Sequence, residues 1–221
     1  MIPLRDENPT QSFSFMTIAL IILNASIFFY EISLGNLLEI TLLRYTVVPY
    51  NFINYFDFSQ LSTLITSQFL HGNLFHLLGN MLYLWIFGNN IEDLLGHLRF
   101  LLFYLLCGIS ASLAHIFTHS QSTIPTLGAS GAISGILGAY FVLFPRAKIL
   151  TLIPFFYFLR IVKVPAFFFL GLWAFWQFLS AVSTPGVEGG FTEGIAWFAH
   201  LGGFLAGILL LPFFLRRRRR D

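Results

Sequence analysis

The sequence predicts an all-α polytopic membrane protein with six transmembrane helices, of which the fourth is short and starts inside the membrane. Of its 221 residues, 57% are hydrophobic and only 10% are charged. A soluble domain carries about a quarter charged residues, so this composition places the chain in a bilayer. The apolar runs are long and continuous and lack the alternation of barrel strands, which favours helices.

The chain begins with a polar segment of 13 residues, which we expect to be a cytoplasmic tail. It lacks the basic start and the cleavage site of a secretory signal peptide, so the first apolar run is expected to be retained as a span. Residues 35–67 mix polar and aromatic side chains and are expected to lie in the membrane interface. The six predicted spans cover residues 14–34, 73–87, 98–117, 130–144, 164–182 and 194–215.

The connections between the later spans are short or amphipathic. Residues 88–93 are expected to form a polar turn, residues 146–163 an interfacial segment, and residues 183–193 a Gly-rich loop. The predicted membrane domain therefore covers residues 14–215, followed by a polybasic cytoplasmic tail at 216–221.

The fourth apolar run, residues 130–144, is shorter than the roughly 20 residues needed to cross a bilayer. If this helix ends at Pro145, its N-terminus stops inside the membrane. The connection before it, residues 119–128, must then dip inward, which is tolerated only where protein surrounds it or water reaches it.

The basic residues predict the orientation of the chain. Six spans put both termini on one side, and most basic residues fall on that side, whereas Arg44 falls opposite. The positive-inside rule therefore places both termini in the cytoplasm. The five arginines at 216–220 follow a membrane segment directly, so we interpret them as a topology signal and expect no nucleic-acid partner.

A serine between glycines stands out in the apolar sequence. Ser130 lies in the run Gly-Ala-Ser-Gly-Ala-Ile-Ser-Gly at 128–135, at the expected N-terminal end of the fourth helix. A hydroxyl becomes a nucleophile only with a base in hydrogen-bond reach and with donors for the oxyanion. Two histidines, His76 and His200, lie inside predicted spans, where an ionisable side chain is costly and usually functional.

His200 shares its helix face with small residues. Gly203 and Gly207 follow it three and seven residues on, which allows close approach of another helix. If this stripe packs on the fourth helix, His200 comes beside Ser130 near the outer membrane face. The small residues of the fourth helix region are Gly128, Ser130, Gly131, Ser134, Gly135 and Gly138.

His76 and Asn80 form an i, i+4 pair on the second span. Their side-chain nitrogens, together with the Ser130 amide at a helix N-terminus, could hold an oxyanion. Asn and His also serve as hydrogen-bonding contacts between membrane helices, and this interpretation of the pair stays open.

Other interpretations of the serine and histidine also remain. Ser130 could belong only to a packing face, and His200 could be a core residue or part of a proton relay. Ser134 is a rival nucleophile, but its hydroxyl lies one turn deeper and can bond back to a carbonyl. No acid is predicted at the depth of His200, which favours a Ser-His dyad over a triad. The lone Cys107 is interpreted as a packing residue, and no cofactor or metal is expected.

The combined order His-x-x-x-Asn, Gly-x-Ser-Gly and Ala-His-x-x-Gly-x-x-x-Gly resembles the rhomboid family of intramembrane serine proteases, over about residues 60–210. The resemblance implies that Ser130 is the nucleophile and His200 its general base. It also implies that His76, Asn80 and the Ser130 amide line the oxyanion site.

By this resemblance, the chain would cleave transmembrane segments of membrane protein substrates near the outer face. Its partners would be those substrates and the lipid bilayer, and its location the bacterial inner (plasma) membrane; the oligomeric state stays open. Two alternatives remain: a catalytically inactive rhomboid-like binding protein, and a proton-coupled transporter that uses the two intramembrane histidines.

Overall fold

The computed structural model describes residues 1–155, 158–183 and 196–215, and helices make up most of this part of the chain. The elements, in chain order, are β1 (Ile2–Asp6), α1 (Phe15–Ser33), η1 (Gly35–Leu37), α2 (Leu38–Tyr45), α3 (Pro49–Asn54), α4 (Ser59–Thr66), η2 (Ser67–Phe69), α5 (Leu74–Tyr83), the π-helical turn η3 (Leu84–Gly88), α6 (Asn89–Leu95), α7 (His97–Thr118), α8 (Ser130–Leu143), β2 (Lys148–Phe155), β3 (Phe158–Pro165), α9 (Ala166–Ser183) and α10 (Trp197–Phe214).

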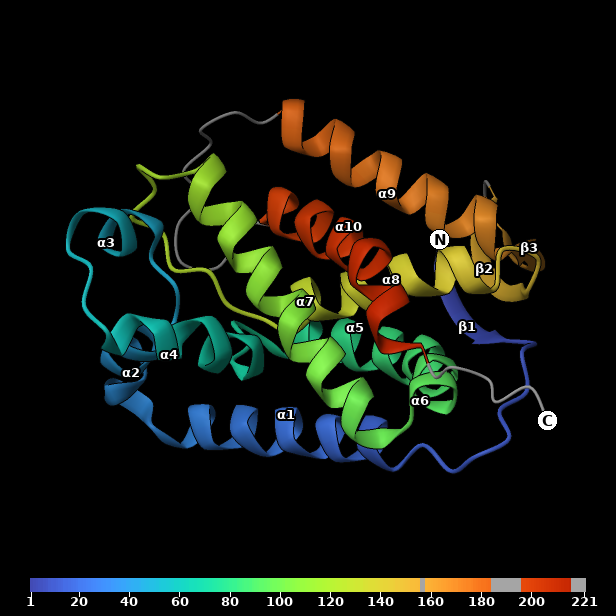
Figure 1. The fold of residues 1–221 in the computed structure, drawn as a ribbon, viewed down its shortest axis with the longest axis horizontal. Coiled ribbons are helices and arrows are strands. Elements are labelled where there is room, and N and C mark those ends of the chain that lie inside the picture. The colour runs from blue at the N-terminus through green and yellow to red at the C-terminus, as the bar shows by residue number, and fades with distance from the viewer. Residues whose placement is uncertain (156–157, 184–195, 216–221) are drawn as a thin grey trace.

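The long helices α7, α9 and α10 pack against α8. Helix α10 packs against α7, α8 and α9, while α1 lies on the opposite side of the molecule from α9 (Figure 1). Every residue of α8 from 131 to 140 is buried, so this short helix forms the centre of the core.

Four of the described helices, α1, α7, α9 and α10, are long and apolar enough to cross a membrane. Helix α8 is a shorter apolar helix, and the helical segment 74–95 changes its hydrogen-bond pattern at η3. The structure therefore gives a polytopic helical membrane protein, and the predicted count of six spans is not confirmed.

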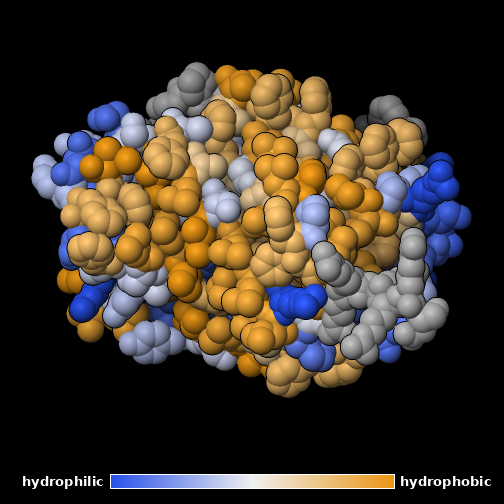
Figure 2. All heavy atoms as spheres, viewed as in Figure 1, coloured by the Kyte–Doolittle hydropathy of each residue, from blue (hydrophilic) through white to orange (hydrophobic). Residues whose placement is uncertain are grey.

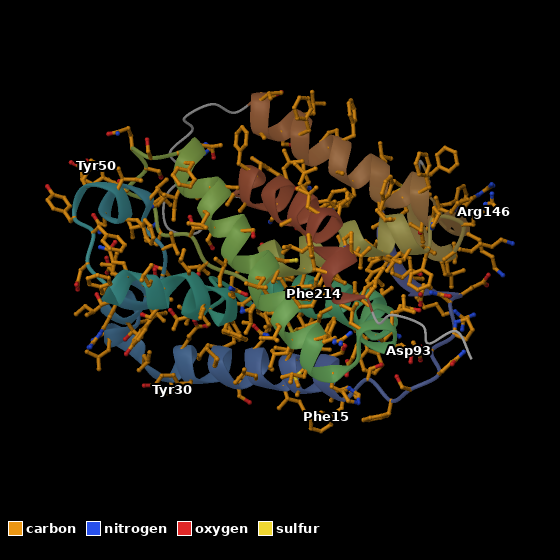
Figure 3. The ribbon with its side chains drawn as sticks, in the orientation of Figure 1. Phe15, Tyr30, Tyr50, Asp93, Arg146 and Phe214 are labelled. Carbon is orange, nitrogen blue, oxygen red and sulfur yellow. The ribbon has the colours of Figure 1, made fainter. Side chains whose placement is uncertain are left out.

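The molecular surface is arranged as expected for a protein embedded in lipid. Hydrophobic residues cover the middle of the face in Figure 2, and hydrophilic residues gather mostly at its two ends. Arg146 lies at the end that carries the strands, and Tyr50 lies at the opposite end with α3 (Figure 3). We expect these two ends to face the two sides of a bilayer.

The chain is not entirely α-helical, because segment 146–163 forms part of a small sheet. Strands β2 and β3 form an antiparallel hairpin, and β1 pairs with the other edge of β2, from Ile2 opposite Leu152 to Asp6 opposite Ile149. The hairpin is rich in Ile, Val and Phe, which suit strands. Its pairing with the N-terminus joins segments far apart in sequence, which a local pattern cannot reveal.

Residues 88–93 are helical rather than a polar turn. Their acids accept hydrogen bonds from the N-terminal segment: the Glu92 carboxylate accepts from the Met16 and Thr17 amides at 2.7 Å, and Asp93 accepts from the Ser12 amide at 2.8 Å. These partners satisfy the two carboxylates of the segment. The predicted loop 183–193 and tail 216–221 lie outside the described residues, except for Ser183 at the end of α9.

Backbone hydrogen bonds hold the connection that precedes α8, and its residues 124–128 are half-buried. Its Thr126 pairs with Val47 through backbone hydrogen bonds of 2.7 and 3.2 Å, and the Gly128 amide donates to the Ser67 carbonyl at 2.8 Å. These contacts meet the requirement for non-helical backbone at membrane depth.

Candidate active site

Ser130 and His200 are in direct contact although they are 70 positions apart. Ser130 is the first residue of α8, and His200 lies in the first turn of α10; the His200 Nε2 is 2.9 Å from the Ser130 Oγ. Both residues are half-buried. A ring nitrogen at this distance from a hydroxyl is within the reach that a general base needs.

Glycines on the two helices make this contact possible. A Cβ added to Gly203 would lie 2.1 Å from the carbonyl oxygen of Gly131, and one on Gly207 would lie 1.9 Å from that of Gly135. No larger side chain fits at these positions without moving α8 away from α10. The close approach therefore holds His200 against Ser130.

The remaining glycines have separate contacts. A Cβ on Gly138 would lie 2.1 Å from the Phe204 carbonyl oxygen, again between α8 and α10. Gly128 lies in the connection before α8, with φ of +122°. A Cβ there would lie 2.7 Å from the His76 ring, so Gly128 allows His76 to approach the start of α8 rather than packing two helices.

His76 and Asn80 lie near the start of α8, next to Gly128. Both line a cavity of about 380 Å³ together with Ser130 and His200, and both flank Gly128. The Ser130 amide lies at the N-terminus of α8, where backbone N–H groups have no acceptor within the helix. The cavity therefore brings a hydroxyl, an imidazole and several hydrogen-bond donors together.

Ser134 has a different environment. Its hydroxyl donates to the Ser130 carbonyl at 2.6 Å, which confirms the expected bond back to the helix. Ser134 is also buried, with 1% of its surface exposed. This leaves Ser130 as the hydroxyl that faces a base.

Two residues behind Asn80 are not predicted from the sequence to belong to the site. The Asn80 Nδ2 lies 3.1 Å from Nε2 of the buried His71 ring. The His71 amide donates to the Glu31 carboxylate, with both oxygens at 3.3 Å. Glu31 is 2% exposed, and an acid inside an apolar span is a signal that could have identified it.

Gln177 of α9 is the third residue that the sequence pattern does not single out. Its Oε1 lies 2.6 Å from the His200 Nδ1, on the far side of the ring from Ser130. A neutral amide in an apolar helix carries no charge signal. Trp173, one turn earlier on α9, places its ring 6.1 Å from the His200 ring.

The apolar helices and these contacts together indicate a polytopic helical membrane protein with a serine–histidine pair in a cavity. Within the described residues, no group of three or more His, Cys, Asp or Glu side chains could hold a metal ion. The cavity supplies a hydroxyl, an imidazole and hydrogen-bond donors.

The chain belongs to the rhomboid family: the Rhomboid domain matches residues 59–217. It is 35% identical to "Rhomboid protein 1, mitochondrial" of Saccharomyces cerevisiae over 152 residues, which are 66% of this chain and 40% of the relative. It is 31% identical to the "Presenilin-associated rhomboid-like protein, mitochondrial" of Homo sapiens over 186 residues, which are 81% and 46% of the two chains.

The chain spans less than half the length of these curated relatives. The names of these relatives place them in mitochondria, so they do not support the predicted location in a bacterial inner membrane. Family membership and the apolar helices support an integral membrane protein.

Proposed function

We propose that this protein is an intramembrane serine endopeptidase that cleaves transmembrane segments of membrane protein substrates near the outer membrane face. The observation that carries the proposal is the 2.9 Å contact between the His200 Nε2 and the Ser130 Oγ inside the cavity. In support, rhomboid family proteins act on membrane protein substrates. Both termini would then lie on the inner side of the membrane.

The proposed reaction is acyl transfer. His200 removes the proton of the Ser130 hydroxyl, and the oxygen attacks the scissile carbonyl carbon. The carbonyl electron pair moves to the oxygen, which His76, Asn80 and the Ser130 amide stabilise. The intermediate expels the amine, which takes the proton from His200, and water then hydrolyses the acyl-enzyme in the same way.

The substrate must expose its scissile carbonyl. In a transmembrane helix this group is hydrogen-bonded within the backbone, so unwinding is needed before attack. Cleavage should favour segments with Gly, Pro or other residues that weaken helices.

The test is cleavage of a transmembrane substrate by the purified protein in detergent and in proteoliposomes. Ser130→Ala and His200→Ala are expected to lower kcat by at least about 1,000-fold, because each removes a member of the reacting pair. Ser134→Ala is the matched control on the same helix and should keep kcat within a few-fold. A fluorophosphonate should label the wild type and not Ser130→Ala.

Undiminished cleavage by Ser130→Ala would contradict the proposal. An unlabelled wild type that cleaves no transmembrane substrate would instead favour the catalytically inactive rhomboid-like protein. Proton flux that depends on His76 and His200 in proteoliposomes would favour the transporter.

A further inference from the structure

We infer that Gln177 is a positioning residue that holds the His200 imidazole in the tautomer that can accept the Ser130 proton. This inference rests on the proposed function and extends the dyad by a neutral third member. The Gln177 Oε1 is 2.6 Å from the His200 Nδ1, and the Ser130 Oγ is 2.9 Å from Nε2, so the two partners hold both ring nitrogens.

The tautomer decides whether the ring can act as a base. A neutral imidazole carries one N–H, and Nε2 can take the serine proton only if that hydrogen is on Nδ1. The amide oxygen of Gln177 accepts a hydrogen bond from Nδ1–H and so favours this form. The opposite amide orientation would offer N–H to Nδ1 and leave the hydrogen on Nε2, where it blocks proton transfer.

The surroundings explain why an amide suits this position. Gln177 is 6% exposed, on a helix with the composition of a membrane span. A buried carboxylate would carry a large desolvation cost in this environment, whereas an amide dipole carries no net charge. The amide oxygen still stabilises the imidazolium that forms when Nε2 takes the proton.

Helix α9 contributes two contacts to the His200 ring. Trp173 and Gln177 are four residues apart and therefore share one face of α9. The Trp173 ring lies 6.1 Å from the His200 ring at an interplanar angle of 33°. The tryptophan restricts the position of the imidazole. The glutamine fixes the rotation of the ring and determines which ring nitrogen carries the hydrogen.

The proton can be followed through both steps of acylation. The Ser130 proton moves to Nε2, the Oγ–C bond forms, and the ring becomes an imidazolium with Nδ1–H still bonded to Gln177. When the C–N bond breaks, the departing amine takes the proton from Nε2. Gln177 neither gains nor loses a proton in either step.

The test compares Gln177→Met with Gln177→Glu in the purified full-length protein. Methionine is unbranched and of similar length but has no comparable acceptor, whereas glutamate keeps the acceptor and adds a charge. We expect Gln177→Met to lower kcat at least about 30-fold with little change in KM. Gln177→Glu should keep more activity than Gln177→Met, with the acidic limb of its kcat/KM profile moved to higher pH.

A merely structural role predicts the opposite order. Methionine suits an apolar span better than glutamate, so Gln177→Met should have the higher Tm of the two. Activity that follows the acceptor rather than Tm supports positioning. Phe178→Leu is the control, since Phe178 is the next residue on α9 and is 52% exposed. The rate of fluorophosphonate labelling of Ser130 gives a second measurement that needs no substrate.

Two results would overturn the inference: a kcat for Gln177→Met within about twofold of wild type, or equal losses in both variants. These results are distinct from failure of the proposed function. If the proposed function fails, the wild type and Phe178→Leu would also show no cleavage or labelling that depends on Ser130.

Discussion

Ser130 and Ser134 lie one turn apart on α8, yet only one hydroxyl is available for chemistry. The Ser134 hydroxyl donates to a backbone carbonyl of its own helix, while the Ser130 hydroxyl faces the His200 ring. The difference arises because Ser130 is the first residue of the helix and has no preceding helical carbonyl to bond. Position within the helix, rather than residue type, separates a packing serine from a candidate nucleophile.

A single ion pair also makes the stability of the folded state depend on pH. The Lys163 ammonium hydrogen-bonds to Glu7 at 2.5 Å and holds the pKa of this carboxyl below its usual range. The folded state then binds the proton less tightly than the unfolded state. The resulting stability is present above the ordinary pKa of Glu and is lost as pH falls through the lowered value.

We therefore expect Glu7→Gln to lower Tm slightly at pH 7, and the difference from wild type to vanish in acid. The measurement is Tm between pH 7 and pH 3 in detergent. Added salt should shrink the difference, because the pair is exposed. Glu39→Gln, which removes an exposed acid from α2, serves as the control for charge alone. A Tm difference that grows in acid would contradict this assignment.

At the scale of elements, the packing of α8 on α10 carries the site. The two helices approach so closely that the carbonyl oxygens of Gly131 and Gly135 occupy the space of side chains at Gly203 and Gly207. In the middle of a helix glycine is normally less stable than alanine. At these positions the cost is offset by the packing that close approach permits.

Gly203→Ala is expected to lower Tm by several degrees and kcat by about 100-fold, since a displacement of about 1 Å separates the base from the serine. Gly171→Ala on α9 is the matched control, because its Cβ would lie an ordinary 3.7 Å from the Phe141 ring. Its Tm should stay equal or rise. Normal activity in Gly203→Ala would show that the helices can separate without loss of the site.

The sequence predicts some of these elements well and others poorly. The helices α1, α7 and α8 begin and end within one residue of the expected limits, because polar and apolar stretches alternate clearly there. The strands are missed because β1 pairs with β2, which lies far from it in the sequence. Ser130 and His200 stand out as polar groups in apolar runs, whereas the role of Gln177 depends on a contact that only the packed helices create.

At the scale of the whole molecule, hydrophilic residues gather mostly at two opposite ends (Figure 2). Arg146 and the strands lie at one end, and Tyr50 lies at the other (Figure 3). The chain has one cysteine, Cys107, and it is fully buried. Engineered cysteines can therefore report the accessibility of each end.

We expect an impermeant maleimide to label Tyr50→Cys from the outer side of sealed cells or organelles, and Arg146→Cys only after permeabilisation. The reason is that the basic residues gather at the strand end, which the positive-inside rule assigns to the inner side. Wild type, with buried Cys107, is the control for background. The reverse pattern of labelling would invert the orientation.

Helix α8 has 14 residues, so its length is about 21 Å. A bilayer core is about 30 Å thick. If Arg146, which follows its C-terminal end, lies at one boundary, the helix stops about 10 Å short of the other boundary. Under the proposed function, the length of α8 would set the depth below the outer surface at which a peptide bond is cut, so unrelated substrates would share one cutting depth.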